Sequence, residues 1–117
     1  MKPFLHAFRG IAAMVRTQRH AKIHCAILLA VIVAGFAFGL KAGEWCAVLL
    51  AAGLVLSAEA FNTAVESLAD AVHPEHHPLV GRAKDVAAGG VLIAALVAVA
   101  IGALVFLPRV NLWILPR

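Results

Sequence analysis

Residues 86–107, VAAGGVLIAALVAVAIGALVFL, contain no charged side chain. The hydrocarbon core of a bilayer is about 30 Å thick, and a helix of about 20 apolar residues crosses it. An apolar run of this length therefore predicts a transmembrane helix. The composition agrees, since 63% of the 117 residues are hydrophobic and 14% are charged. Soluble domains carry about 45–50% apolar and about 25% charged residues.

Two further apolar stretches cover residues 23–40 and 45–72. They predict two more transmembrane helices, so that 1–117 forms a single integral membrane domain. The composition also argues against a disordered chain, a disulfide-built secreted module and a basic nucleic-acid-binding domain. We therefore expect no nucleic acid among the partners of this chain.

The segment ahead of the first apolar stretch has an amphipathic pattern. Phe4, Phe8, Ile11 and Val15 follow the spacing i, i+4, i+7, i+11, which places them on one helical face. Basic residues occupy other positions, so residues 1–22 predict a helix lying on the membrane surface. The predicted fold is thus all-α, with an N-terminal amphipathic surface helix followed by three transmembrane helices.

The distribution of basic residues predicts the orientation. Seven of the ten Lys and Arg residues lie before residue 23 or in the link 73–85. Because cytoplasmic loops carry an excess of Lys and Arg, both segments are predicted to be cytoplasmic and the C-terminus to lie outside.

A stripe of polar residues interrupts the second apolar stretch. Glu59, Asn62, Glu66 and Asp70 fall within about 80° of arc on a helix of 100° per residue. Glu59 lies 14 residues after Trp45, or about 21 Å into a core about 30 Å thick. A carboxylate at that depth is costly unless it is paired or hydrated, so it marks a functional site.

The charges that follow this stripe suggest phosphate chemistry. Lys84 and Asp85 precede the last apolar stretch, on the same predicted side of the membrane. Mg²⁺ in nucleotide sites uses one or two carboxylates together with phosphate oxygens. Lysine offsets phosphate charge, and a further carboxylate can accept a proton from a hydroxyl. A site for Mg²⁺ and ATP is therefore expected at the cytosolic boundary.

Four segments carry a resemblance to a known family. EAFNTAVESLAD at 59–70 and HHPLVGRAKDVAAGGVL at 76–92 closely resemble the bacterial membrane diacylglycerol kinases, and the chain is most similar to the branch that contains undecaprenol kinase. GIAAMVRTQRHAKIH at 10–24 and FLPR at 106–109 look like corresponding segments of that branch. The resemblance extends from about Phe4 to Arg109.

The resemblance implies a homotrimer in the bacterial inner membrane, with composite active sites between subunits. It implies transfer of the γ-phosphoryl group of ATP, with Mg²⁺, to a lipid hydroxyl at the cytosolic interface. The implied acceptor is undecaprenol. The alternative is diacylglycerol, which would make the product phosphatidic acid.

The resemblance also implies roles for individual residues. Glu59 matches the general base, Glu66 the carboxylate that holds the metal with ATP, and Asn62 the amide between them. Lys84 and Asp85 match the pair at the nucleotide phosphates, where Asp85 would orient Lys84 or a water-bound metal. Two further groups fall where the nucleotide is contacted in the family: Glu75, His76 and His77 in the link, and His6 and Arg9 on the surface helix.

Gln18 departs from the family pattern. The family usually has a metal-binding glutamate at this position, whereas glutamine keeps an acceptor oxygen and loses the charge. Gln18 is therefore a metal-site position with weaker expected Mg²⁺ binding, and Glu66 becomes the main protein charge on the metal.

Two other classes of function compete with a kinase. An oligomeric ion or proton pathway also places carboxylates along a helix face. Such a pathway needs polar residues in both leaflets, whereas the stretches 45–56 and 86–107 are apolar. A purely structural membrane subunit would leave the combination of Glu59, Glu66, Lys84 and Asp85 without a role.

Overall fold

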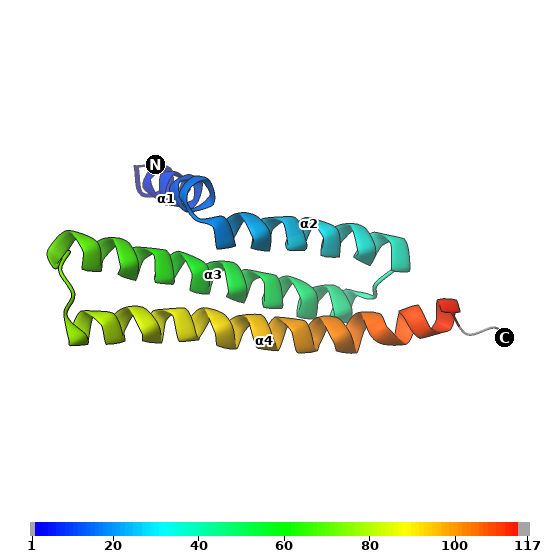
Figure 1. Cartoon of the computed structure of the whole chain (residues 1–117). Coiled ribbons are helices and arrows are strands. Elements are labelled where there is room, and N and C mark those ends of the chain that lie inside the picture. The colour runs from blue at the N-terminus through cyan, green and yellow to red at the C-terminus, as the bar shows by residue number, and fades with distance from the viewer. Residues whose placement is uncertain (1, 115–117) are drawn as a thin grey trace.

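The computed structural model describes residues 2–114 and the side chains of these residues except Trp113. Four helices account for the chain, in the order α1 (Lys2–Thr17), α2 (Arg19–Phe38), α3 (Ala42–Val72) and α4 (Pro78–Ile114) (Figure 1). Three of them, α2, α3 and α4, are long and apolar enough to cross a membrane. The predicted all-α architecture with a short first helix and three apolar helices is confirmed.

The helix boundaries differ from those predicted. The first helix ends at Thr17 and α2 begins at Arg19, rather than at residues 22 and 23, because Gln18 adopts an extended backbone with φ −103° and ψ 118°. The last helix begins at Pro78, so that residues 78–85 are helical and not part of the link. Proline suits the first helical position, because its φ is already helical and it has no N–H to satisfy.

Local chemistry accounts for both turns between the long helices. Gly39 caps α2 with a left-handed φ of 68°, a conformation that glycine adopts without steric cost. Lys41 then caps α3 in a capping box with Glu44, whose Oε1 accepts a hydrogen bond from the Lys41 N–H at 3.1 Å. At the other end, α3 stops before His73, since the residue preceding Pro74 disfavours helical backbone.

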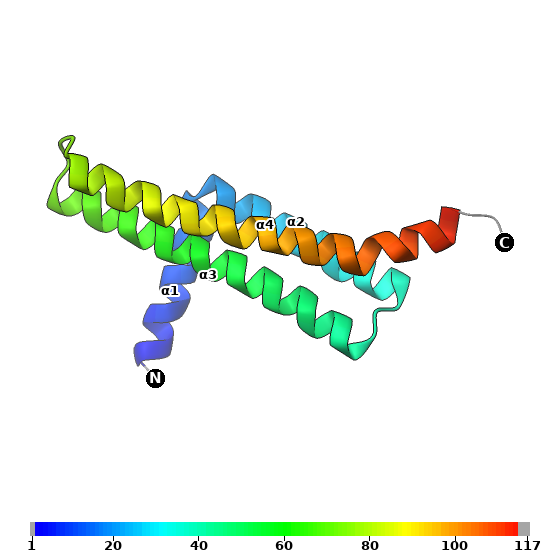
Figure 2. The ribbon, with the colours of Figure 1, turned by 90° about the horizontal axis from the view of Figure 1, so that it is seen from below.

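The long helices lie side by side, while α1 turns away from them (Figure 2). α3 packs along α4, α2 packs on α3, and α1 contacts α2 and α3. Met14 is the buried residue of α1, whereas Phe4 and Phe8 on the amphipathic face are 71% and 66% exposed. An apolar face left open in this way suits a helix that lies in a membrane surface.

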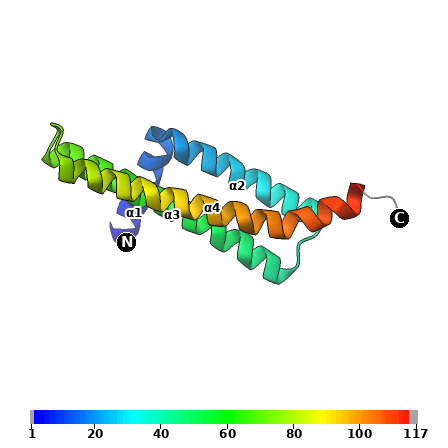
Figure 3. The same ribbon diagram turned by 60° about the horizontal axis from the view of Figure 1, so that its bottom comes forward.

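The hairpin formed by α3 and α4 extends past the start of α2 (Figures 1 and 3). α3 has 31 residues and α4 has 37. At 1.5 Å per residue they are about 46 Å and about 55 Å long, which exceeds a hydrocarbon core of about 30 Å. We call the end of the hairpin that carries residues 73–77, which extends past the start of α2, its projecting end.

Arg109 of α4 holds the opposite end of the bundle together. Its guanidinium forms an ion pair with Glu44 of α3, and its Nη1 donates to the Phe38 carbonyl of α2 at 3.0 Å. We call these three groups the Arg109 clamp. Aromatic contacts lie beside it, with ring centroids of Phe36 and Trp45 5.0 Å apart. One side chain thus ties all three long helices together.

Candidate active site

Glu59 is the one charged residue that is buried within residues 2–114, with 2% of its surface exposed. It lies on α3, 15 residues beyond Glu44, which corresponds to about 22 Å. Its carboxylate receives no hydrogen bond from the described residues, and Thr63 Oγ1 donates to its backbone carbonyl instead. A buried carboxylate without such donors is costly to maintain, so its presence points to a function.

The imidazole of His24 on α2 faces the carboxylate of Glu59. Its Nε2 lies 3.8 Å from Glu59 Oε2. His24 is 14 residues before Phe38, or about 21 Å along α2, which matches the depth of Glu59 because the Arg109 clamp aligns the two helices. Sequence analysis gave His24 no role, although a titratable side chain inside an apolar helix was a signal.

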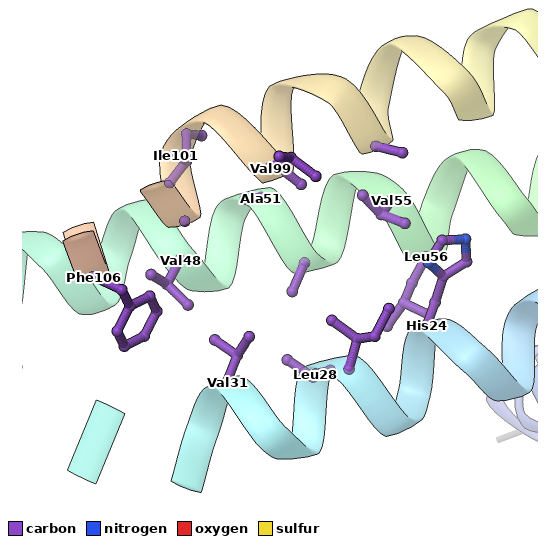
Figure 4. A pocket seen from close by; sticks show the side chains of 15 residues that line it. His24, Leu28, Val31, Val48, Ala51, Val55, Leu56, Val99, Ile101 and Phe106 are labelled. Atoms are coloured by element: carbon purple, nitrogen blue, oxygen red, sulfur yellow. The ribbon is translucent and has the colours of Figure 1, made fainter. Parts of the chain in front are cut away.

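An apolar cavity of about 300 Å³ opens beside this pair, between α2, α3 and α4. His24, Val55 and Leu56 line one end, and Val48, Ile101 and Phe106 line the other (Figure 4). Apart from His24 the lining side chains are hydrocarbon or glycine. The cavity suits a hydrocarbon chain whose polar end meets His24 and Glu59.

Asn62 and Glu66 continue the polar stripe toward the projecting end of the hairpin. Asn62 Nδ2 donates to Glu66 Oε1 at 3.3 Å, so the amide orients the carboxylate. Asn62 Oδ1 is buried and has no hydrogen-bond partner in the described chain. A buried acceptor left in this way is available to a ligand. Glu66 lies 22 residues beyond Glu44, about 33 Å along α3, and so nearer than Glu59 to the projecting end of the hairpin.

Lys84 of α4 pairs with Asp70 of α3 rather than with the adjacent Asp85. Lys84 Nζ donates to Asp70 Oδ1 at 2.6 Å. Asp85 is exposed, and in the described chain no hydrogen bond or ion pair joins its side chain to Lys84. The expectation that Asp85 orients Lys84 therefore gives way to Asp70. The reason is geometric, since neighbouring residues on a helix point in different directions.

The link between α3 and α4 is ordered by its histidines. His73 Nδ1 lies 2.9 Å from the Glu75 carbonyl, and His77 Nδ1 accepts a hydrogen bond from the Leu79 N–H at 3.1 Å. The rings of His73 and His77 meet edge to face with centroids 5.2 Å apart. His77 thus caps α4, while Glu75 and His76 are exposed.

The chain matches the family described as prokaryotic diacylglycerol kinase over residues 5–106. The chain belongs to this family. Its members are lipid kinases, and the residues of the polar stripe lie within the matched region.

Three relatives are similar to this kinase over most of its length. Undecaprenol kinase of Bacillus subtilis is 43% identical over 108 residues, covering 92% of this chain and 88% of the relative. A diacylglycerol kinase of Synechocystis is 40% identical, covering 90% of this chain and 61% of the relative. Diacylglycerol kinase of Escherichia coli K12 is 36% identical, covering 80% and 77%. The resemblance inferred from the sequence is confirmed.

Some predicted site residues of the kinase remain apart within one chain. His6 and Arg9 are exposed on α1, and Gln18 lies at the break between α1 and α2. In the described residues no hydrogen bond or ion pair joins them to Glu59, Glu66 or Lys84. One chain therefore assembles the centre of the predicted site, and the contributions of α1 are not assembled.

The oxygen donors present suit a metal held jointly with a nucleotide. Within residues 2–114, no three His, Cys, Asp or Glu residues cluster closely enough to hold an ion by themselves. Glu66 supplies a carboxylate, and Asn62 Oδ1 is a buried oxygen without a partner. Mg²⁺ commonly takes one or two protein carboxylates and completes its shell with phosphate oxygens and water. The residues therefore fit Mg²⁺ bound as its ATP complex.

Proposed function

We propose that this kinase transfers the γ-phosphoryl group of ATP to the hydroxyl of undecaprenol. The observation that carries this function is the buried Glu59 carboxylate, which lies 3.8 Å from His24 at one end of an apolar cavity. Support for the lipid comes from the 43% identity with a protein named undecaprenol kinase over nearly its whole length. In bacteria this activity would supply the phosphorylated form of a polyprenyl lipid.

Glu59 acts as the general base. The lipid hydroxyl meets Glu59 at the mouth of the cavity, and the first part of its hydrocarbon chain lies among the side chains of α2, α3 and α4. Glu59 accepts the hydroxyl proton as the oxygen attacks the γ-phosphorus. Burial excludes water, which would otherwise compete as the phosphoryl acceptor.

The nucleotide binds at the projecting end of the α3–α4 hairpin. Glu66 and Asn62 would hold Mg²⁺ together with ATP, and the bound ion would neutralise charge on the β- and γ-phosphates. Lys84 adds a cation at the same level, since it lies 25 residues before Arg109, or about 38 Å along α4. Glu59 is seven residues from Glu66, about 10 Å along α3, a separation that leaves room for the γ-phosphoryl group.

The complete site forms in a homotrimer, with α1 and the 73–77 link on the cytoplasmic side of the inner membrane. Exposed apolar side chains such as Phe61 and Leu104, at 75% and 77%, offer surface to lipid or to further subunits. A neighbouring subunit can bring the residues that one chain leaves apart to the nucleotide. These residues are His6, Arg9, Gln18, Glu75, His76, His77 and Asp85.

Diacylglycerol is the second candidate acceptor. It is favoured by the family description and by the names of the Synechocystis and Escherichia coli relatives. The chemistry is the same for both lipids, because each presents a primary hydroxyl to Glu59. The difference lies in the hydrocarbon, which is one chain in undecaprenol and two in diacylglycerol.

The deciding experiment offers both lipids at once. Purified protein in mixed micelles receives labelled ATP with Mg²⁺, undecaprenol and diacylglycerol, and the products are separated. We expect phosphate mainly on undecaprenol, and none with Glu59→Gln. Transfer mainly to diacylglycerol would assign the second candidate, and the absence of transfer to either from folded protein would contradict both.

A further inference from the structure

We propose that His24 carries the catalytic proton away from Glu59, as a positioning and proton-exit residue for the buried base. This role rests on the proposed function of Glu59. It is assigned from the contact between His24 Nε2 and Glu59 Oε2 at 3.8 Å across the interface of α2 and α3. That separation is about 1 Å longer than a hydrogen bond, so proton transfer requires the two side chains to approach each other.

Burial gives Glu59 a difficulty that His24 resolves. After each turnover Glu59 holds the proton of the lipid hydroxyl and must lose it before the next cycle. The Glu59 side chain is 3% exposed, whereas the His24 side chain is 20% exposed. Histidine gains and loses a proton near neutral pH, which makes it suited to pass a proton between a buried group and water.

Other charged side chains near the pair form no ion pair with Glu59 in the described part of the chain. On α2 these side chains are Arg19, His20 and Lys22, and all three are exposed. On α3, Glu59 itself faces His24, and Glu66 is about 10 Å further along the helix. α4 contributes Ala95 and Ala98 to the adjoining cavity and has no titratable residue between Asp85 and Arg109. The titratable residues of α1 are exposed, and none forms an ion pair with His24 or Glu59. They are Lys2, His6, Arg9 and Arg16.

The proton balance is complete within these groups. The O–H bond of the lipid breaks as its oxygen bonds to the γ-phosphorus, ADP leaves, and an O–H bond forms on Glu59. That bond then breaks as Nε2 of neutral His24 takes the proton. Imidazolium finally releases a proton from Nδ1 to water, which leaves Glu59 ionised and His24 neutral with its hydrogen on Nε2. Proton exchange with water then moves that hydrogen back to Nδ1, so that Nε2 can accept a proton in the next turnover. No oxidant, reductant or further reactant is needed.

The test replaces His24 with glutamine, which keeps a hydrogen-bonding side chain and cannot relay a proton. We expect His24→Gln to lower kcat about tenfold or more while KM for ATP stays unchanged. In His24→Ala, whose short side chain leaves room for the free base, imidazole added to the assay should restore kcat, and substituted imidazoles should do so in an order set by their basicity. His20→Gln is the matched control, because His20 is an exposed histidine one turn away on α2 and lacks the contact with Glu59.

Two results would overturn the role of His24. One is a wild-type kcat for His24→Gln. The other is a lowered kcat of His24→Ala that imidazole does not restore in protein whose helix content and oligomeric state match the wild type, since His24 would then only shape the site. The wild-type enzyme is assayed in parallel, so either result leaves the proposed lipid kinase activity standing. Loss of that activity in the wild type would instead refute the function itself.

Discussion

Two carboxylates of α3, Glu44 and Glu59, have opposite surroundings. Glu44 caps its own helix through the Lys41 N–H and pairs with Arg109. Glu59 is more deeply buried and has only His24 near its oxygens, without a hydrogen bond. One carboxylate is satisfied by the chain itself, and the other is left to be satisfied by a substrate.

This difference separates a structural charge from a reactive one. At the Arg109 clamp, an ion pair with Glu44 and a hydrogen bond to the Phe38 carbonyl hold three helices in register. At the polar stripe, Glu59 and Asn62 Oδ1 retain unused hydrogen-bonding capacity in a buried environment. Such groups lower the stability of the folded chain and raise its capacity for chemistry. Substitutions at the Arg109 clamp should therefore change stability, whereas substitutions in the polar stripe should change turnover.

The largest effect is expected for Glu59→Gln. Loss of the base should lower kcat about 100-fold or more, while ATP binding is retained. Thermal stability should be unchanged or raised, because a buried charge without hydrogen-bond donors is removed. Turnover with labelled ATP and thermal unfolding of the same preparation check both parts. Ordinary turnover would remove Glu59 from the role of base.

Glu66→Gln should act on the metal nucleotide rather than on the lipid. Loss of the carboxylate is expected to raise the Mg²⁺ concentration for half-maximal activity about tenfold or more. The KM for the lipid should stay constant, and Glu66→Asp should recover part of the metal response. A Mg²⁺ dependence equal to that of the wild type would show that Glu66 is not a ligand.

Filling the cavity should discriminate between lipid acceptors by length. Ala98→Phe places a ring in the space between α2, α3 and α4, so we expect KM for undecaprenol to rise about tenfold. A short-chain alcohol should be phosphorylated as before. Ala100→Phe is the matched control, because Ala100 is exposed on the same helix. Equal KM values for undecaprenol in both variants would place the lipid chain elsewhere.

Arg109→Ala should affect stability with little effect on chemistry. It removes the Arg109 donors from the Glu44 carboxylate and the Phe38 carbonyl, so the unfolding temperature should fall by several degrees. Below that temperature kcat should match the wild type, since the clamp is about 22 Å from Glu59 along α3. Arg109→Lys should lie in between, because lysine lacks the forked donors of arginine. A loss of kcat at low temperature would show that the Arg109 clamp and the site at Glu59 are coupled.

The smallest effect is expected for Asp70→Asn. The pair with Lys84 is exposed, so its removal should cost about 0.5 kcal/mol of unfolding free energy. KM for ATP should change little, whereas Lys84→Gln should raise it, since Lys84 is placed to offset phosphate charge. An equal rise of KM for ATP in both variants would make Asp70 part of the nucleotide site.

The sequence predicted more of the fold than of the contacts. Apolar runs of sufficient length and the amphipathic pattern of Phe4 and Phe8 identified the helices, because both are local properties of the chain. The break at Gln18 was placed several residues too late, since no proline or glycine marks it. The start of α4 at Pro78 was missed because polar residues after it read as a link.

In the candidate site, too, the sequence identified residues that share one helix and missed contacts between helices. Glu59, Asn62 and Glu66 were identified from spacing along one helix, and the structure confirms that they share α3 with Glu59 buried. His24 beside Glu59 and Asp70 beside Lys84 are contacts between helices. Their residues are far apart in sequence, so periodicity along one helix carries no information about them.

The amino-acid sequence by itself makes this chain helical and apolar and places a polar stripe on α3, since residue type and a repeat of 3.6 residues suffice for each. Only the packing of α2, α3 and α4 decides which charges are neutralised and which stay reactive. Arg109 reaches Glu44 because the helix ends meet, and His24 reaches Glu59 because both lie at the same depth. Electrostatic pairing depends on distance in space, and the chain acquires those distances only when its helices pack.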